Sequence, residues 1–187
     1  MSDTYYVKTF GGLEITNDNV TVNIVELFGK QLVNLLQVLL FHSEKPVQKD
    51  ELIDILWPES KNPSSALKFS IFRLRAELNE IEFFKDKEVI VTTRKGYILN
   101  PNLDWNIDFV ELEKAYNQIN DGSEPLDEKE FKTARKIFRL YQGRFYASPS
   151  QLHWILQKQE IFRQMYVKTM MRTSCYLYTQ KRYDEMM

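Results

Sequence analysis

The sequence is poor in the residues that stabilise small secreted proteins or hold metal ions. Among 187 residues it has one cysteine, two histidines, six glycines and six prolines. The single cysteine, Cys175, cannot form an internal disulfide, and no histidine or second cysteine stands beside it to complete a metal site or a redox pair. We therefore expect a protein of a reducing compartment, the cytoplasm, with no metal and no cofactor.

Signals for export and membrane insertion are also missing. The N-terminus is polar and has no apolar stretch behind a basic cluster. The longest apolar run, Leu35 to Phe41 with Gln37 inside it, is far too short to span a bilayer. With 43% hydrophobic residues and no monotonous segment, the chain instead has the material for one large or two small packed cores.

The residue groups that most enzymes need do not occur either. Neither His42 nor His153 has a serine, a cysteine or a carboxylate cluster at catalytic spacing, and there is no glycine-rich phosphate-binding loop. Three carboxylates, Asp50, Glu51 and Asp54, have a spacing that fits the solvent side of an amphipathic helix better than a metal-binding nuclease cluster. We predict that the protein is not an enzyme.

The formal net charge of −1 hides two basic segments. Residues 61–100 carry eight lysines and arginines against five acidic residues, and residues 131–187 carry eleven against three. A basic segment is more often a solvated surface than a binding site, so it supports DNA binding only where geometry gives a reason.

The first hundred residues predict a small antiparallel sheet followed by three helices. Short β-favouring pieces between residues 4 and 23 are separated by turn-forming residues. Leucines at positions 32, 35, 36 and 39 repeat with helical spacing, and a second helical pattern from residue 49 ends at Trp57-Pro58. Asn62, as a cap, and Pro63 begin a third helix that runs to about Asn79.

A β-hairpin over residues 89–99, with Arg94 and Lys95 at its turn, completes this part of the chain. Three helices followed by a hairpin wing form a winged helix-turn-helix, an architecture that docks on DNA. Pro101 to Asp104 then predict a linker. Beyond it the patterns are helical, over residues 107–119, over residues 131–141, and from about Pro149, with Ser148 as a cap, to about Thr179. The fold class is mainly α with small β, in two domains over residues 1–100 and 104–187.

The third helix has an unusual outer face. At 100° per residue, Leu67, Ile71, Leu74 and Leu78 fall within about 60° of one another and form a stripe that faces the core. The opposite side presents residues that an ordinary surface helix would not combine, namely Ser65, Phe69, Phe72, Arg73 and Ala76, with Lys68 and Arg75 beside the stripe. Exposed phenylalanines are unfavourable unless something covers them.

A major-groove helix uses such a mixture of residues. Arginine can bind a guanine edge with two hydrogen bonds, an apolar side chain can contact a thymine methyl, and flanking Lys68 and Arg75 can neutralise phosphates. The alternative is that Phe69 and Phe72 pack against the second domain and that Arg73 is merely solvated. Trp57 is as well explained by a core position as by a phosphate contact. Arg94 and Lys95 could reach a minor groove or backbone, although charges at exposed turns are common without function.

Four short motifs follow one another in the first hundred residues: FGGLEI at residues 10–15, DELIDILW at 50–57, FRLRAEL at 72–78 and GYIL at 96–99. In this order they resemble the LGxLxV, DELxxxLW, SRLRxxL and GYxL motifs of the OmpR/PhoB-type winged helix in the Streptomyces antibiotic regulatory protein (SARP) family. The likeness continues into the family's bacterial transcriptional activator domain. Residues 104–109 resemble its DxxxF pattern, with four residues between Asp104 and Phe109, and residues 141–145 resemble its YxGxF pattern.

The resemblance implies functional positions as well as a fold. Phe69 and Arg73 occupy the family's base-reading places, Ser65, Phe72 and Arg75 neighbouring contact places, and Trp57 a phosphate-contacting place. Phe72 stands where a basic or polar residue is more usual, and the wing is shorter, with Arg94 one residue closer to the glycine. The family also implies tetratricopeptide-like helical hairpins after residue 104, binding to promoter DNA, often as dimers on direct repeats, and recruitment of RNA polymerase.

The C-terminal residues 181–187 resemble the first turn of a further tetratricopeptide helix, so we expect the chain to be a fragment of a longer protein. The sequence thus predicts a DNA-binding transcriptional regulator. The alternative is a protein–protein adaptor whose winged helix no longer binds DNA. In that case Arg135, Arg139 and Arg144 would hold an acidic partner, although a solvated helix face also explains them.

Overall fold

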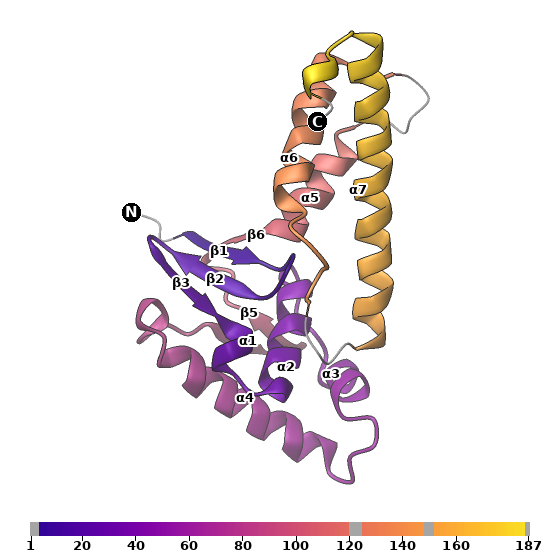
Figure 1. The fold of residues 1–187 in the computed structure, drawn as a ribbon. Helices are drawn as coiled ribbons and strands as arrows, with labels where there is room; N and C mark the ends of the chain where they lie inside the picture. Colours follow the sequence, from indigo (N-terminus) through magenta and orange to yellow (C-terminus); the bar gives the residue numbers. More distant parts are fainter. Residues whose placement is uncertain (1–3, 120–124, 148–151, 186–187) are drawn as a thin grey trace. The chain divides into compact units, whose positions relative to one another are not determined.

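The computed structural model describes residues 4–119, 125–147 and 152–185, and its helices and small sheets are drawn in Figure 1. The predicted fold class, mainly helical with small β-structure, is confirmed. By their contacts the residues form two compact units: a winged-helix unit, Met1–Tyr6 with Glu14–Trp105, and a helical unit, Val7–Leu13 with Asn106–Met187. Each unit is described by itself below.

The winged-helix unit contains the three predicted helices. After strands β2 (Glu14–Asn17) and β3 (Val20–Asn23) come α1 (Ile24–Leu27), α2 (Lys30–Phe41), α3 (Lys49–Leu56) and α4 (Pro63–Asn79), and then the short 3-10 helix η1 (Glu82–Phe84). Helices α2, α3 and α4 pack against one another. Their shared core is mainly apolar, because α2 buries every residue from Leu32 to Leu40, of which only Asn34 and Gln37 are polar, and α3 buries Leu52 and Leu56.

A two-stranded hairpin closes this unit. Strand β4 (Ile90–Thr93) pairs antiparallel with β5 (Gly96–Leu99), in the register Ile90 opposite Leu99 and Thr93 opposite Gly96. The turn between them consists of Arg94 and Lys95, as the sequence predicts. All four residues of β5 are buried, so this strand is held by the core and the turn is left at the surface.

The N-terminal sheet has one strand more than expected. Its order is β3-β2-β1-β6, with β1 at Thr4–Lys8 and β6 at Asp104–Ile107. The prediction that Pro101 to Asp104 form a linker is therefore wrong at its end, because Asp104 begins a strand. In β6 the exposed Asp104 and Asn106 alternate with the more buried Trp105 and Ile107. The alternation covers only four residues, and Asp and Asn are poor strand formers, so the sequence pattern did not predict a strand here.

Two local details also differ from expectation. Helix α1 was not predicted. It is one turn long and is capped by Asn23, whose side chain accepts a hydrogen bond from the Val25 N–H at 3.1 Å. The proposed cap of α4 is wrong in its chemistry, since the Asn62 side chain makes no capping hydrogen bond and only its carbonyl accepts the first helical bond, from Ala66. The Ser148 cap lies outside the described residues.

The helical unit consists of α5 (Asp108–Asn117), α6 (Glu128–Leu140), α7 (His153–Thr179) and the 3-10 helix η2 (Tyr183–Glu185). Helix α6 packs against both α5 and α7. Its N-terminus is fixed by a capping box, in which Asp127 and Glu130 each accept a hydrogen bond from the other's backbone N–H. The core of the unit is aromatic, and the rings of Phe10, Phe109 and Phe145 lie around Phe162.

The segment Val7–Leu13 is held in the helical unit by one buried carboxylate. Asp108 accepts hydrogen bonds from the Thr9 N–H at 2.7 Å and the Phe10 N–H at 3.1 Å, and also from the Thr9 hydroxyl. Gly11 continues the attachment, because its N–H donates to the Arg144 carbonyl at 2.9 Å. With φ at +87°, a Cβ on Gly11 would lie 2.8 Å from the Gln142 carbonyl oxygen, so glycine is required there.

Asp108→Ala should lower the free energy of unfolding by about 2 to 4 kcal/mol, because buried backbone N–H groups would lose their acceptor. Chemical denaturation of the variant and the parent measures this. Asp184→Ala, which removes an exposed carboxylate of the same unit, is the control and should change the free energy by less than about 0.5 kcal/mol.

The pH dependence of that difference has a definite sign. Burial raises the pKa of the Asp108 carboxyl above its ordinary value, although the hydrogen bonds from Thr9, Phe10 and Phe109 act in the opposite direction. The carboxyl therefore stabilises the fold most at a pH below its unfolded-chain pKa, and this contribution is lost as the pH rises through the raised pKa of the folded state. The difference between the parent and Asp108→Ala should shrink from about pH 4 to pH 7. A difference that grows over this range would contradict the assignment.

Candidate nucleic-acid interface

Helix α4 has the two faces that the sequence predicts. Leu67, Ile71, Leu74 and Leu78 are all buried, each less than 4% exposed. On the other side, Phe69 and Phe72 are 62% and 69% exposed. Ser65, Lys68, Arg73 and Ala76 are exposed beside them. The core of the winged-helix unit therefore does not cover the two phenylalanines, and they form an apolar surface on a helix whose rotation the leucines fix.

Arg73 lies on this outer face and forms one exposed ion pair, with Glu77. Its guanidinium donates to the Glu77 carboxylate at 3.3 Å, one helical turn away, and both side chains are more than a third exposed. An exposed pair of this kind contributes at most about 1 kcal/mol, so a stronger acceptor can displace Glu77. Lys68 is exposed on the same helix and lies nearer the buried stripe.

Arginine 75 has a different position, which the sequence does not reveal. Its Nε and Nη2 both donate to the Ile90 carbonyl, at 3.1 and 2.8 Å, and Nη2 also donates to the Thr92 hydroxyl at 2.8 Å. The planar guanidinium thereby joins α4 to the first strand of the wing. Its expected role as a DNA contact stays a prediction, while its role in the fold is to set the distance between α4 and the hairpin.

The wing is anchored at its base and exposed at its tip. Tyr97 of β5 pairs with Val47, which lies in the loop between α2 and α3. The Val47 N–H donates to the Tyr97 carbonyl at 2.8 Å, and the Tyr97 N–H donates to the Val47 carbonyl at 3.0 Å. Gly96 allows this approach, since its φ is +140° and a Cβ there would lie 1.9 Å from the Val47 carbonyl oxygen. Arg94 and Lys95 are exposed at the turn. The strand pair thus presents two cations from a base that the core holds in place.

Trp57 ends α3, where its backbone N–H donates to the Ile53 carbonyl at 2.8 Å. It is half-buried, which fits both a packing role and a phosphate contact of its exposed edge.

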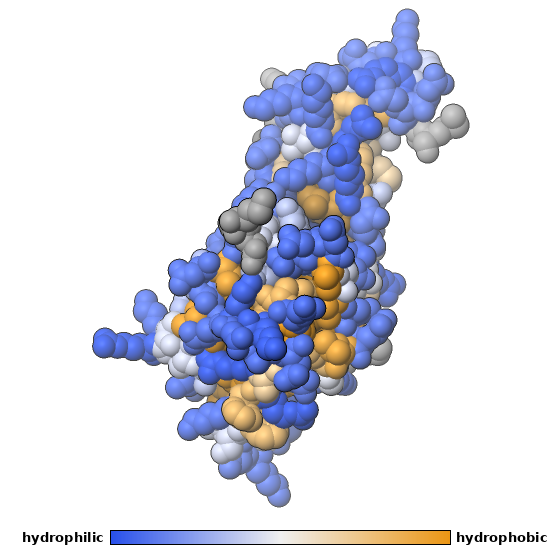
Figure 2. Space-filling view, turned by 90° about the vertical axis from the view of Figure 1, so that its left-hand side faces the viewer, coloured by the Kyte–Doolittle hydropathy of each residue, from blue (hydrophilic) through white to orange (hydrophobic). Residues whose placement is uncertain are grey.

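Further apolar residues reach the surface of the winged-helix unit outside α4. Leu27 and Val20 are each about half exposed. The space-filling view in Figure 2 shows such apolar areas interrupted by hydrophilic side chains. Helix α4 differs in that its two exposed apolar residues are large aromatic rings three residues apart, beside an arginine and a lysine.

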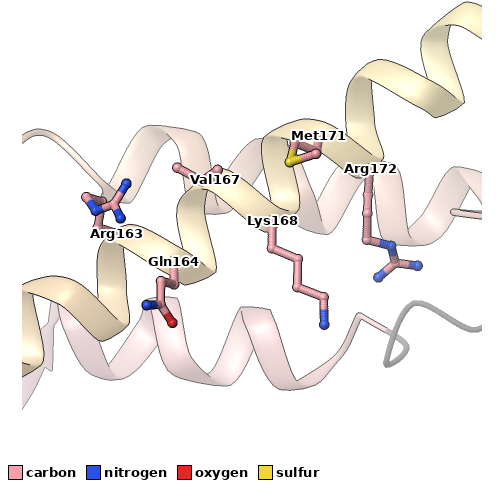
Figure 3. Close-up of a pocket in the computed structure, with 6 residues that line it drawn as sticks. All are labelled: Arg163, Gln164, Val167, Lys168, Met171 and Arg172. Carbon is pink, nitrogen blue, oxygen red and sulfur yellow. The ribbon is translucent and has the colours of Figure 1, made fainter.

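A shallow pocket lies on α7 in the helical unit. It has a volume of about 310 Å³ and is lined by Arg163, Gln164, Val167, Lys168, Met171 and Arg172. Figure 3 shows Gln164, Lys168 and Arg172 extending from one side of the helix at intervals of four residues. The lining contains no carboxylate, histidine or thiol, so it offers cations and apolar surface rather than acid–base chemistry.

Within residues 4–119, 125–147 and 152–185, no three histidine, cysteine or acidic side chains come together as a metal site. In the same residues, no helix combines the length and the apolar character needed to cross a bilayer. Cys175 is exposed on α7.

Comparison with known proteins agrees with the winged-helix geometry. Residues 25–99 match the family model described as "Transcriptional regulatory protein, C terminal". This range runs from α1 through the three-helix core to the end of the hairpin, so the part of the chain that resembles this family is the winged helix. The match does not extend to the helical unit, so the likeness of that unit to the bacterial transcriptional activator domain stays a prediction.

A solved structure is similar in fold to nearly the whole chain. EmbR of Mycobacterium tuberculosis, solved in complex with a low-affinity phosphopeptide, is similar with a TM-score of 0.65 and 16% identity, over 98% of this chain and 47% of EmbR. This chain thus spans about half the length of EmbR. The DNA-binding domain of Escherichia coli CadC is similar over 53% of this chain and 92% of its own, with 24% identity and a TM-score of 0.39. No curated protein sequence matches the chain.

Gly96→Ala should destabilise the winged-helix unit by about 2 to 4 kcal/mol, because the new Cβ would collide with the Val47 carbonyl and the backbone conformation disfavours alanine. Denaturation monitored by circular dichroism gives the change. Gly12→Ala is a matched control, since a Cβ at Gly12 meets nothing within 4 Å, and it should shift stability by less than about 0.5 kcal/mol. Equal effects of the two substitutions would show that the wing is not held at Gly96.

Proposed function

We propose that this protein is a sequence-specific DNA-binding regulator of transcription that inserts α4 into the major groove of promoter DNA. The observation that carries the proposal is the exposure of Phe69, Phe72 and Arg73 on a helix whose opposite face is buried. An α-helix fits the major groove, which is about 12 Å wide, and the wing supplies a second contact with the duplex. The family match over residues 25–99 supports the same function.

The proposal assigns roles by position. Phe69 and Arg73 contact base edges, and Ser65, Lys68, Phe72, Arg75 and Trp57 contact neighbouring bases or phosphates. Arg94 and Lys95 on the wing contact the minor groove or the backbone. Arg75 serves DNA binding mainly through its bonds to Ile90 and Thr92, which hold the wing at a fixed distance from α4.

The helical unit provides the surface for regulation in this proposal. Its roles are dimerisation of the protein on direct repeats, response to a signal, or recruitment of RNA polymerase. The unit exposes Met170, Met171 and Tyr178 on α7, three large side chains that a partner protein could cover. Two bound copies would place two α4 helices on half-sites spaced by whole turns of the duplex.

The second candidate function is that of an adaptor. It is favoured by the basic pocket on α7 and by the exposed Arg135, Arg139 and Arg144, which fit an acidic protein surface. In that case the winged helix would have no DNA affinity. The two functions differ in whether a duplex is bound and in how the binding responds to salt.

Selection of bound duplexes from a random pool separates the two candidates. The regulator should enrich a defined site, and its affinity should fall steeply as salt is raised, with a slope that indicates several phosphate contacts. Repeated half-sites in the enriched sequences would reveal a dimer and its spacing. An adaptor would enrich no sequence.

On the selected site, Arg73→Ala should weaken binding by about 1 to 3 kcal/mol and relax the preference at one base pair, because a bidentate base contact is lost. Lys68→Ala should weaken all duplexes alike and lower the salt slope by about one, because a phosphate contact is lost. Fluorescence anisotropy at several salt concentrations measures both effects. Lys129→Ala, at an exposed lysine of α6, should leave affinity and slope unchanged. Intact specificity in Arg73→Ala would mean that another element reads the bases.

A further inference from the structure

We propose that α4 recognises its DNA site largely through the 5-methyl groups of thymine, which Phe69 and Phe72 cover. This inference rests on the proposed function and names the chemical feature of the DNA that the interface selects. It follows from the composition of the outer face, from the spacing of the two rings and from the hydrogen bonds that hold Arg75 to the wing strand.

The composition of the face limits what it can bind. A phenylalanine ring has no hydrogen-bond donor or acceptor that matches the polar edges of the bases. In the major groove the apolar feature that distinguishes one base from the others is the thymine methyl group. Two rings that are mostly exposed in the free protein therefore gain burial when thymine methyl groups lie against them.

The spacing of the rings fits neighbouring base pairs. Residues three apart on an α-helix emerge from the same side and are separated by about 4.5 Å along the axis. Successive base pairs are about 3.4 Å apart along the duplex. Phe69 and Phe72 can thus cover methyl groups on adjacent or nearly adjacent base pairs, so the preferred site carries thymines close together on either strand.

The arginines of α4 strengthen the case because the structure gives them partners within the protein. Arg75 directs its donors to the Ile90 carbonyl and the Thr92 hydroxyl, and Arg73 donates to Glu77. Base readout by Arg75 must break its bonds to the wing strand, whereas contact through the rings displaces only water. Arg73, whose exposed pair with Glu77 is readily displaced, adds its base contact to those of the rings. Lys68 beside the rings attracts the phosphates that bring the groove to this face.

The test replaces thymine by deoxyuridine, which differs from it only by the methyl group. Each thymine of the selected duplex is replaced in turn, and the dissociation constants of the parent, Phe69→Ala and Phe72→Ala are measured for each duplex. At the thymines that α4 covers, the parent should lose about three- to fivefold in affinity per methyl group. Each alanine variant should lose this penalty at its own position and keep it at the other.

Controls keep the outcome interpretable. Phe69→Leu retains an apolar side chain and should retain most of the deoxyuridine penalty, and Lys129→Ala should retain all of it. Circular dichroism verifies that the variants are folded, which their exposed positions favour.

Two results overturn the inference and leave the proposed function standing. One is specific binding by the parent with no penalty for deoxyuridine at any position. The other is a penalty that both alanine variants keep in full, which would place the methyl contact elsewhere. Failure to bind any duplex specifically would instead overturn the proposed function itself.

Discussion

The burial of four aliphatic side chains decides what helix α4 can present to a partner. Leu67, Ile71, Leu74 and Leu78 lie in the core formed with α2 and α3, and each contributes about 1.5 to 3 kcal/mol relative to an exposed position. Turning the helix by one residue would expose part of this stripe and bury charged groups. The rotation of α4 is therefore fixed with a wide margin, and Phe69, Phe72 and Arg73 face outward as a result.

The rest of the winged-helix unit holds the wing in a defined place relative to that face. The Arg75 guanidinium bonds to β4, and the backbone of Tyr97 pairs with Val47 where only glycine fits at position 96. These contacts join α4, the loop after α2 and the hairpin by polar bonds of fixed geometry. Recognition of a duplex by two elements needs such a constraint, because a helix and a wing that moved independently would lose entropy on binding.

The sequence predicts those features of the fold that follow from local periodicity. Helical spacing located α2 by its leucines and placed the ends of α3 and α4 to within about one residue, and the turn at Arg94-Lys95 located the hairpin. Features that depend on distant pairing were missed. Strand β6 is recognisable only beside β1, and the attachment of Val7–Leu13 depends on Asp108, about a hundred residues later. The hydrogen bonds from Arg75 to Ile90 form because strand β4 lies beside α4, and no pattern within the helix reveals that neighbour.

The most direct test of this account asks whether Phe69 touches bases when the protein binds its site. A photoreactive benzoyl-phenylalanine in place of Phe69 is irradiated in complex with a selected duplex, and the crosslinked nucleotide is mapped, with Tyr183 in the helical unit as the comparison position. The account predicts efficient crosslinking from position 69 to a base within the selected site. A complex that forms with full specificity but crosslinks to the DNA only from position 183 would contradict it.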